Sequence, residues 1–305
     1  MKEASLQAAI TACEEIILGK SQQIRLAFCC LLAKGHLLIE DRPGVGKTTL
    51  ANTLAQVLGL SHQRIQFTSD LLPADLLGCA IYQIENSQFH FHPGPIFHQL
   101  ILADEINRTS PKTQSALLEA MEEQQVTVEG QTRPLNVPFF VIATQNPNQQ
   151  SGTFPLPESQ LDRFLMCISL GYPDPEAERR LLQGEDPRHK MAHLSNALTP
   201  ELLLQLQQQV NSVHASDALL DYLQHLLAFS RQTKHFIDGL SPRAGMGLLR
   251  AARAWALLEQ RDYLLPEDLQ AVLPAVVGHR LQLNQNSPSE REVVVEKLLN
   301  GVAIP

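Results

Sequence analysis

The chain contains 305 residues, of which 44% are hydrophobic and 18% charged, and its formal net charge is −8. It is long enough for about two domains with sizeable cores, and its composition is that of an ordinary globular protein. The acidic balance argues against a nucleic-acid-binding surface, and no apolar run reaches the ~20 residues of a membrane span. We therefore expect a cytoplasmic protein without a signal peptide, which neither inserts into a membrane nor binds nucleic acid.

The cysteines point to the same compartment. Five are present, an odd number without C-x-x-C spacing. This usage is typical of a reducing environment, where thiols stay free and pack as small apolar side chains. We predict buried thiols, and neither disulfides nor zinc ligands, at Cys13, Cys29, Cys30, Cys79 and Cys167.

Two helices are predicted at the start of the chain, over 4–18 and 21–34, from apolar residues at helical spacing. The break between them resembles a helix C-cap followed by a new start. In nucleotide-binding folds a turn such as that at Leu18 and Gly19 can lie against an adenine ring, although a plain interhelical turn has the same sequence. Both residues are candidate contacts of a nucleotide base.

The stretch GHLLIEDRPGVGKTTLA, residues 35–51, is the strongest motif in the chain. A buried strand is predicted at 37–39, followed by a Gly/Pro turn and a helix that should end near Gly59. Gly44 and Gly46 let backbone N–H groups turn inward at the start of the helix. These groups would form a concave anion site that fits a triphosphate.

The chemistry of this loop depends on its polar residues. Lys47 would reach the β- and γ-phosphates, and the hydroxyl of Thr48 would hold Mg²⁺. Asp41 stands where the pattern G-x-x-x-x-G-K-[ST] has glycine. A carboxylate there would repel a triphosphate and weaken binding, unless it points away, for example toward Arg42. The candidate nucleotide-binding residues of the loop are Asp41, Arg42, Pro43, Gly44, Val45, Gly46, Lys47, Thr48 and Thr49.

The next segments alternate between strands, turns and helices. A strand is predicted at 62–68 and a short helical turn at 73–77. Alternating residues then predict a hairpin insertion over about 78–97. A helix follows at 111–124, with Ser as its N-cap and Pro at its first position. A second hairpin is predicted over 125–137.

Two buried strands in this region end in polar residues. The apolar run 100–103 ends in Asp104 and Glu105, and the run 138–144 leads to Asn146. The carboxyl ends of parallel strands meet at one edge of a sheet, so these side chains should lie beside the glycine-rich loop. Asp104 would hold Mg²⁺ through water, Glu105 would polarise the attacking water, and Asn146 would bind the γ-phosphate and the attacking water. Helix capping and an Asn-Pro turn are the simpler interpretations of the same residues.

The second half of the chain is predicted to be helical. A short helix ends at 161–164, a strand follows at 165–169, and GYPDP at 171–175 is a stiff joint where a domain boundary would fall. The helices beyond it are expected at about 175–184, 199–212, 216–231, 242–259 and 266–276. We thus predict an α/β nucleotide-binding core with a parallel sheet over 1–171, carrying both hairpins as insertions, and a smaller all-helical lid over 172–305.

The order of these motifs resembles that of the AAA+ ATPases, and specifically of the MoxR family. The resemblance spans nearly the whole chain and is carried by EDRPGVGKTTLA, LLPADLLG, FHPGPIF, LADEINRTSPKTQSALLEAMEEQQVTVEG, VIATQNPNQQSGTFPLPESQLDRF and SPRAGMGLLRAARAWALLEQRDYLLPEDLQAVLPAV. It implies a P-loop NTPase core with a helical lid, which binds ATP and Mg²⁺ and hydrolyses ATP.

Each site motif of the family has a matching segment in this sequence. The matches are Walker A at Lys47 and Thr48, Walker B at Asp104 and Glu105, and sensor 1 at Asn146. Arg163 matches the arginine finger, which would complete the site of a neighbouring subunit. Arg243, in Ser-Pro-Arg, matches sensor 2 on the lid, where lid closure would bring it onto the phosphates. A solvated or Asp-paired arginine at 243 would have the same sequence.

The resemblance implies an ATP-driven motor that forms a ring of identical subunits, expected to be hexameric. Such rings are chaperone-like, and remodel or activate partner proteins that often contain a von Willebrand factor A domain. One alternative is an AAA+ motor acting on nucleic acid, against which the acidic balance argues. Another is an ATP-gated binding switch with little turnover, against which Glu105, Asn146 and Arg163 argue together.

Overall fold

The computed structural model describes residues 2–85, 87–146, 153–184, 190–191, 194, 196–284 and 291–304. Its centre is a sheet of five parallel strands in the order β2-β5-β8-β1-β9. These strands are β1 (Leu37–Glu40), β2 (His62–Gln66), β5 (Leu100–Asp104), β8 (Phe140–Gln145) and β9 (Met166–Ile168). The predicted α/β class with a parallel sheet is confirmed.

Helices cover both faces of the sheet. Those of the first half are α1 (Lys2–Ile16), α2 (Ser21–Leu32), α3 (Lys47–Val57), α4 (Pro73–Leu77), α5 (Pro111–Glu123) and α6 (Glu158–Leu161). Leu38 and Ile101 pack in a core with α4 and α5, whereas their neighbours Leu37 and Leu102 pack in a core with α1, α2 and α3. This alternation explains why the strands are continuous apolar runs, because both faces are buried.

The second half is helical, as predicted. Its helices are α7 (Pro175–Leu182), α9 (Pro200–Ser212), α10 (Asp217–Gln232), α11 (Pro242–Leu258), α12 (Pro266–Val277) and α13 (Arg291–Asn300). Asp174, Thr199 and Ser241 cap the starts of α7, α9 and α11 with side-chain hydrogen bonds, and a proline follows each. The sequence interpretation missed α13, a short helix with a weak apolar pattern whose buried residues include Val294 and Leu298.

The second half is not a separately packed unit. Apolar residues of α9 to α13 belong to the same core as those of α1, α2 and α3. The predicted joint lies at Gly171, whose positive φ of 63° favours glycine. The division into 1–171 and 172–305 stays a prediction, and the shared core favours a lid that is held firmly against the sheet.

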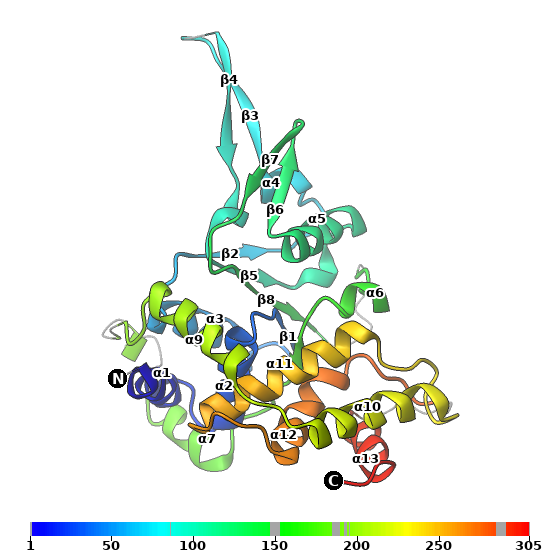
Figure 1. Cartoon of the computed structure of the whole chain (residues 1–305). Coiled ribbons are helices and arrows are strands. Elements are labelled where there is room, and N and C mark those ends of the chain that lie inside the picture. Colours follow the sequence, from blue (N-terminus) through cyan, green and yellow to red (C-terminus); the bar gives the residue numbers. More distant parts are fainter. Residues whose placement is uncertain are drawn as a thin grey trace.

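Both predicted hairpins are present and project from one end of the molecule, away from the C-terminal helices (Figure 1). The first consists of β3 (Gly78–Gln83) and β4 (Gln88–Pro93), and the second of β6 (Gln125–Val128) and β7 (Gln131–Pro134). They contact each other, since the guanidinium of Arg133 lies 3.8 Å from the ring centre of Phe91. Asn86, in the predicted turn of the first hairpin, lies outside the described residues.

The described part of the chain bears on two predictions from composition, on membrane spans and on cysteines. None of its helices combines the length and apolar character required to cross a bilayer. Four of the five cysteines are buried free thiols, but Cys79 is exposed on the first hairpin. The prediction of a buried thiol was wrong there, because one face of this two-stranded hairpin has no helix to cover it.

Candidate functional site

The glycine-rich loop lies between the end of β1 and the start of α3. Gly44 (φ 85°) and Gly46 (φ 93°) adopt left-handed conformations that side chains disfavour. A Cβ atom at either position would have no neighbour within 4 Å, so backbone conformation, and not crowding, calls for glycine. Helix α3 begins at Lys47, and the first N–H groups of a helix have no partners within it. These groups and the helix dipole make the loop a site for an anion.

Lys47 lies across this loop and is almost wholly buried, with 8% of the residue exposed. Its ammonium donates hydrogen bonds to the carbonyl oxygen of Asp41 at 2.5 Å and of Arg42 at 3.3 Å, and to Oδ1 of Asn146 at 3.0 Å. Burial lowers the pKa of Lys47, and three nearby carboxylates oppose that effect. Because all three acceptors are neutral, a phosphate would be a stronger partner for the ammonium.

Glu105 and Asn146 meet at the carboxyl edge of the neighbouring strands β5 and β8. The amide nitrogen of Asn146 donates to Oε1 of Glu105 at 3.1 Å, and the backbone N–H of Glu105 donates to the hydroxyl of Thr144 at 2.9 Å. Glu105 has a left-handed backbone, with φ 58° and ψ 50°, which is uncommon outside glycine and asparagine. The structure therefore brings Lys47, Asn146 and Glu105 into one hydrogen-bonded chain beside the anion site.

The carboxylate of Asp104 has partners at both of its oxygens. The hydroxyl of Thr144 donates to Oδ1 at 2.5 Å, and Arg64 donates to Oδ2 through Nη2 at 2.7 Å and Nε at 3.2 Å. Glu105 has a cationic partner as well, since Nε of Arg108 lies 3.1 Å from its Oε2. Two arginines thus balance the two acids at the strand end.

Sequence reasoning did not find Arg64, Arg108 or Thr144. Arg64 belongs to β2, which pairs with β5 in the sheet, so its place beside Asp104 depends on strand order. Strand order cannot be read from a local motif. Thr144 could have been found, because it ends the same apolar run that leads to Asn146.

The residues at this edge fit a magnesium ion. Thr48 is the second residue of α3, and with Asp104 it offers hydroxyl and carboxylate oxygens, which are the donors Mg²⁺ prefers. Asp104 already attracts a cationic group in the form of Arg64. A divalent cation could take over that role, and Thr48 and Asp104 stay the predicted metal ligands.

Asp41 does not turn its side chain toward the anion site. Its carboxylate accepts hydrogen bonds from the N–H of Gly171 at 2.6 Å, the hydroxyl of Ser169 at 2.9 Å and the N–H of Arg42 at 2.7 Å. Burial alone would raise the pKa of Asp41, but these hydrogen bonds together hold that pKa below its ordinary value. The expected repulsion of a triphosphate is thereby reduced, and only the backbone oxygen of Asp41 contacts the loop lysine.

Arg42 is not paired with Asp41 through its guanidinium, contrary to the suggested ion pair. That group lies 5.9 Å from the ring centre of Tyr172, and its Nη1 donates to the Tyr172 hydroxyl at 3.4 Å. The exposed guanidinium therefore stands at the rim of the loop, next to the joint between the two halves of the chain.

A hollow beside the loop suits a nucleotide base. It joins the turn after α1 to the glycine-rich loop, and is lined by Ile16, Ile17, Leu18, Lys20, Gly44, Val45, Gly46, Thr49, Pro173 and Leu181. Leu18 lines this hollow, and its contact with a base stays a prediction. Gly19 (φ 70°) does not line it and has a structural role, because a Cβ atom there would come within 2.5 Å of Oδ2 of Asp174.

The two predicted arginines lie together elsewhere. Nε of Arg163 is 3.3 Å from Oε2 of Glu122, and Nη2 of Arg243 forms an ion pair with Oε1 of the same carboxylate. Both arginines line a hollow that shares no lining residue with the hollow beside the glycine-rich loop. The structure brings Arg163 and Arg243 to each other, but it does not bring either one to Lys47.

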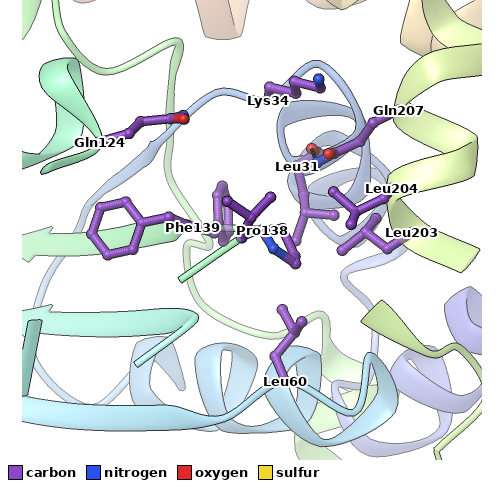
Figure 2. A pocket seen from close by; sticks show the side chains of 11 residues that line it. Leu31, Lys34, Leu60, Gln124, Pro138, Phe139, Leu203, Leu204 and Gln207 are labelled. Atoms are coloured by element: carbon purple, nitrogen blue, oxygen red, sulfur yellow. Dashed lines mark hydrogen bonds between the residues drawn. The ribbon is translucent and has the colours of Figure 1, made fainter. Parts of the chain in front are cut away.

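A further, smaller hollow lies at the opposite edge of the sheet (Figure 2). It is bounded by the end of α2, the start of α9 and the residues that lead into β8, including Pro138 and Phe139. Since β8 runs from this hollow toward Asn146, the hollow lies at the amino ends of the strands. It is therefore separate from the acids and the anion site.

A parallel sheet with a lysine-bearing glycine loop, and with acids and an amide at its carboxyl edge, defines a P-loop ATPase of the AAA type. Residues 36–166 match the "ATPase family associated with various cellular activities (AAA)", and residues 230–299 match the AAA lid domain. Chaperone MoxR1 of Mycobacterium tuberculosis is 40% identical over 315 residues, which cover 99% of this chain and 82% of that protein. The chain belongs to the MoxR family of AAA+ ATPases.

Two further similarities extend over the whole length. YeaC of Bacillus subtilis is 44% identical over 303 residues, which cover 98% of this chain and 95% of that protein. A crystal structure of a candidate ATPase from Cytophaga hutchinsonii superimposes with a TM-score of 0.90 at 36% identity, and covers 100% of this chain and 96% of that one. The fold and the ATPase class predicted from the sequence are thus confirmed.

Proposed function

We propose that this ATPase uses Mg²⁺, assembles as a ring of six copies, and drives the remodelling or activation of partner proteins. The hydrogen-bonded chain from Lys47 through Asn146 to Glu105 carries the hydrolytic part of the proposal. Lys47 and the N–H groups of the glycine loop would hold the phosphates, Asn146 would orient the attacking water, and Glu105 would accept its proton. Thr48 and Asp104 would hold Mg²⁺, which would neutralise charge on the phosphate oxygens.

The position of the two arginines supports assembly. Arg163 and Arg243 line a different hollow from the one that opens onto the glycine loop, and Glu122 holds both. They would therefore act on the nucleotide of an adjoining subunit, by neutralising charge as the γ-phosphate leaves. A contact between two different faces of the same chain is heterologous, and such contacts form a ring when the rotation between subunits closes.

The proposal that this chain acts on a partner protein depends on what similar proteins are named. One is named a chaperone, which supports a protein client for this chain. The family resemblance suggests a client with a von Willebrand factor A domain, and a cytoplasmic setting fits the four buried free thiols. A net charge of −8 argues against nucleic acid as the client.

Mixing two inactive variants tests the shared site. Lys47→Ala removes a subunit's own site but keeps its arginines, whereas Arg163→Ala does the reverse. Each variant alone should be inactive, and an equal mixture should recover up to roughly a quarter of wild-type activity, because half of the subunits keep a site and half of their neighbours keep the arginine. No recovery in a mixture that forms rings of normal mass would contradict the shared site.

A further inference from the structure

We propose that Glu122 is a positioning residue for the reaction: its carboxylate holds Arg163 and Arg243 side by side, so that both reach the adjoining nucleotide as one unit. This inference rests on the proposed function, because it needs the two arginines to act on a neighbouring subunit. It adds a residue that lines a different hollow from the one beside the glycine loop of its own chain.

The carboxylate of Glu122 is divided between the two arginines. Oε2 pairs with Nε of Arg163 at 3.3 Å, and Oε1 pairs with Nη2 of Arg243. Arg163 follows α6 in the first half of the chain, whereas Arg243 is the second residue of α11 in the second half. One side chain therefore connects a cationic group of each half.

Glu122 itself stands on a fixed support. It belongs to the last turn of α5, where the adjacent Met121 is buried against the sheet. The carbonyl oxygen of Met121 accepts a hydrogen bond from Nε2 of the buried His36 at 3.2 Å, and Nδ1 of that histidine accepts from the N–H of Val141 at 3.0 Å. These contacts tie the end of α5, and with it the backbone of Glu122, to β8.

The contact orients the reactive end of Arg163. A guanidinium offers five N–H donors in a rigid fork, and the Arg163 nitrogen closest to Glu122 is Nε. Nη1 and Nη2 lie at the outer end of this side chain, which is 32% exposed. These outer groups are the ones that can bind a phosphate in two places. Glu122 would orient the guanidinium of Arg163 in the same way as a carboxylate orients a metal-binding histidine by accepting a hydrogen bond from it.

Glu122 also offsets repulsion between cations. The hollow around it contains Lys34, Arg163, Arg243, Arg250 and Arg280, with Glu122 and Asp162 as its two carboxylates. Without the Glu122 charge, the guanidinium groups of Arg163 and Arg243 would repel each other and separate. The loss would act on the direction of the side chains more than on folding, because the three groups are partly exposed.

The lid cannot easily carry Arg243 elsewhere. The hydroxyl of Ser241, which caps α11, donates to Oδ2 of Asp162 at 3.1 Å, and Nε of Arg280 donates to Oδ1 of Asp162 at 2.7 Å. Asp162 thus binds the second half of the chain directly. The next residue, Arg163, is linked to that half through Glu122. Arg243 is held where Glu122 can align it.

The test compares Glu122→Gln with Glu123→Gln, the exposed neighbouring glutamate. Gln keeps the shape of the side chain but not its charge. We expect Glu122→Gln to lower kcat for ATP about tenfold, at unchanged KM because the anion site of the same chain is intact. Glu123→Gln should match the wild type. Glu122→Asp, which keeps the charge on a shorter stem, should recover part of kcat.

Mixing with Lys47→Ala subunits locates the effect. A Glu122→Gln subunit has an intact site of its own, so a Lys47→Ala neighbour would give it correctly held arginines. Specific activity should therefore rise when the inactive Lys47→Ala protein is added. An unchanged kcat in Glu122→Gln, or no rise on mixing while the Arg163→Ala mixture does recover, would overturn the role of Glu122 alone. Failure of both mixtures would instead overturn the shared site.

Discussion

The ammonium nitrogen of Lys47 lies 3.0 Å from Oδ1 of Asn146, although 99 positions separate them in the chain. The other end of the same amide donates to Glu105. Asn146 thus contacts both the group that would bind the phosphates and the group that would activate water. A neutral side chain can do this because an amide carries an acceptor and a donor on one carbon.

Replacing Asn146 should separate binding from hydrolysis. Asn146→Ala leaves the glycine loop intact but removes the amide that orients both Lys47 and Glu105. We expect kcat to fall by about 10²-fold, while nucleotide affinity changes by less than about fivefold. Gln145→Ala is the matched control, because Gln145 is the last residue of the same strand but bonds Glu40 instead. A fall in affinity at unchanged kcat would show that Asn146 serves binding alone.

Asp41 should stabilise the fold through the three hydrogen bonds that its carboxylate accepts. Asp41→Asn turns one acceptor into a donor that faces the Gly171 N–H, and should cost about 1–3 kcal/mol of the free energy of unfolding. Because the pKa of Asp41 is lowered in the folded state, its contribution is complete above the ordinary value of 3.8 and is lost as the pH falls below it. Urea titrations of both proteins should therefore differ at pH 7 and converge toward pH 3. An equal difference at both pH values would contradict this role.

His36 should make stability depend on pH in the same direction as Asp41, but at higher pH. Burial lowers the pKa of His36 to about 4, and both ring nitrogens are bonded in the neutral form. The unfolded chain binds a proton near pH 6.5 and the folded chain does not, so stability is full above 6.5 and falls on acidification. Between pH 7 and pH 5, the protonation of His36 in the unfolded chain should lower the free energy of unfolding by about 2 kcal/mol. His36→Gln should show a correspondingly weaker pH dependence in urea titrations, and a His36 resonance titrating near pH 6.5 in NMR spectra would contradict the prediction.

Arg280 should anchor the second half of the chain to the first. Its side chain is 7% exposed, and its guanidinium donates to Asp162 and to the carbonyl oxygens of Phe164 and Leu165. Arg280→Ala would remove these hydrogen bonds from partly buried acceptors and should reduce the free energy of unfolding by about 2–4 kcal/mol. The exposed Arg179 on α7 gives a control, since Arg179→Ala should stay within about 0.5 kcal/mol. Equal thermal stability of the two variants would refute the anchor.

The local parts of the site were predictable because each depends on a short pattern. The glycine loop needs only Gly44, Gly46 and the start of a helix, and the acids Asp104 and Glu105 end a recognisable apolar run. Their convergence followed from a general rule for parallel strands. The register Leu38↔Ala143 between β1 and β8 then places Asn146 near the loop.

What could not be predicted depends on contacts between distant segments. No pattern around Glu122 indicates that Arg163 and Arg243 meet on it, because the three residues come from three separate elements. The side chain of Asp41 was also ambiguous, since its partners Ser169 and Gly171 follow a strand that pairs with β1 only in the folded sheet. Helix α13 was missed because its apolar pattern is weak over only 10 residues.

Glu105→Gln tests the central claim most directly, because Gln keeps the size and the acceptor oxygen of Glu105 but cannot take a proton from water. ATP binding to the purified variant should be measured by equilibrium titration, and its rate of phosphate release should be measured separately. We predict wild-type-like affinity for ATP in the presence of Mg²⁺, together with a kcat lowered by at least about 10²-fold. Phosphate release at the wild-type rate would contradict the assignment of Glu105 as the base at the end of β5.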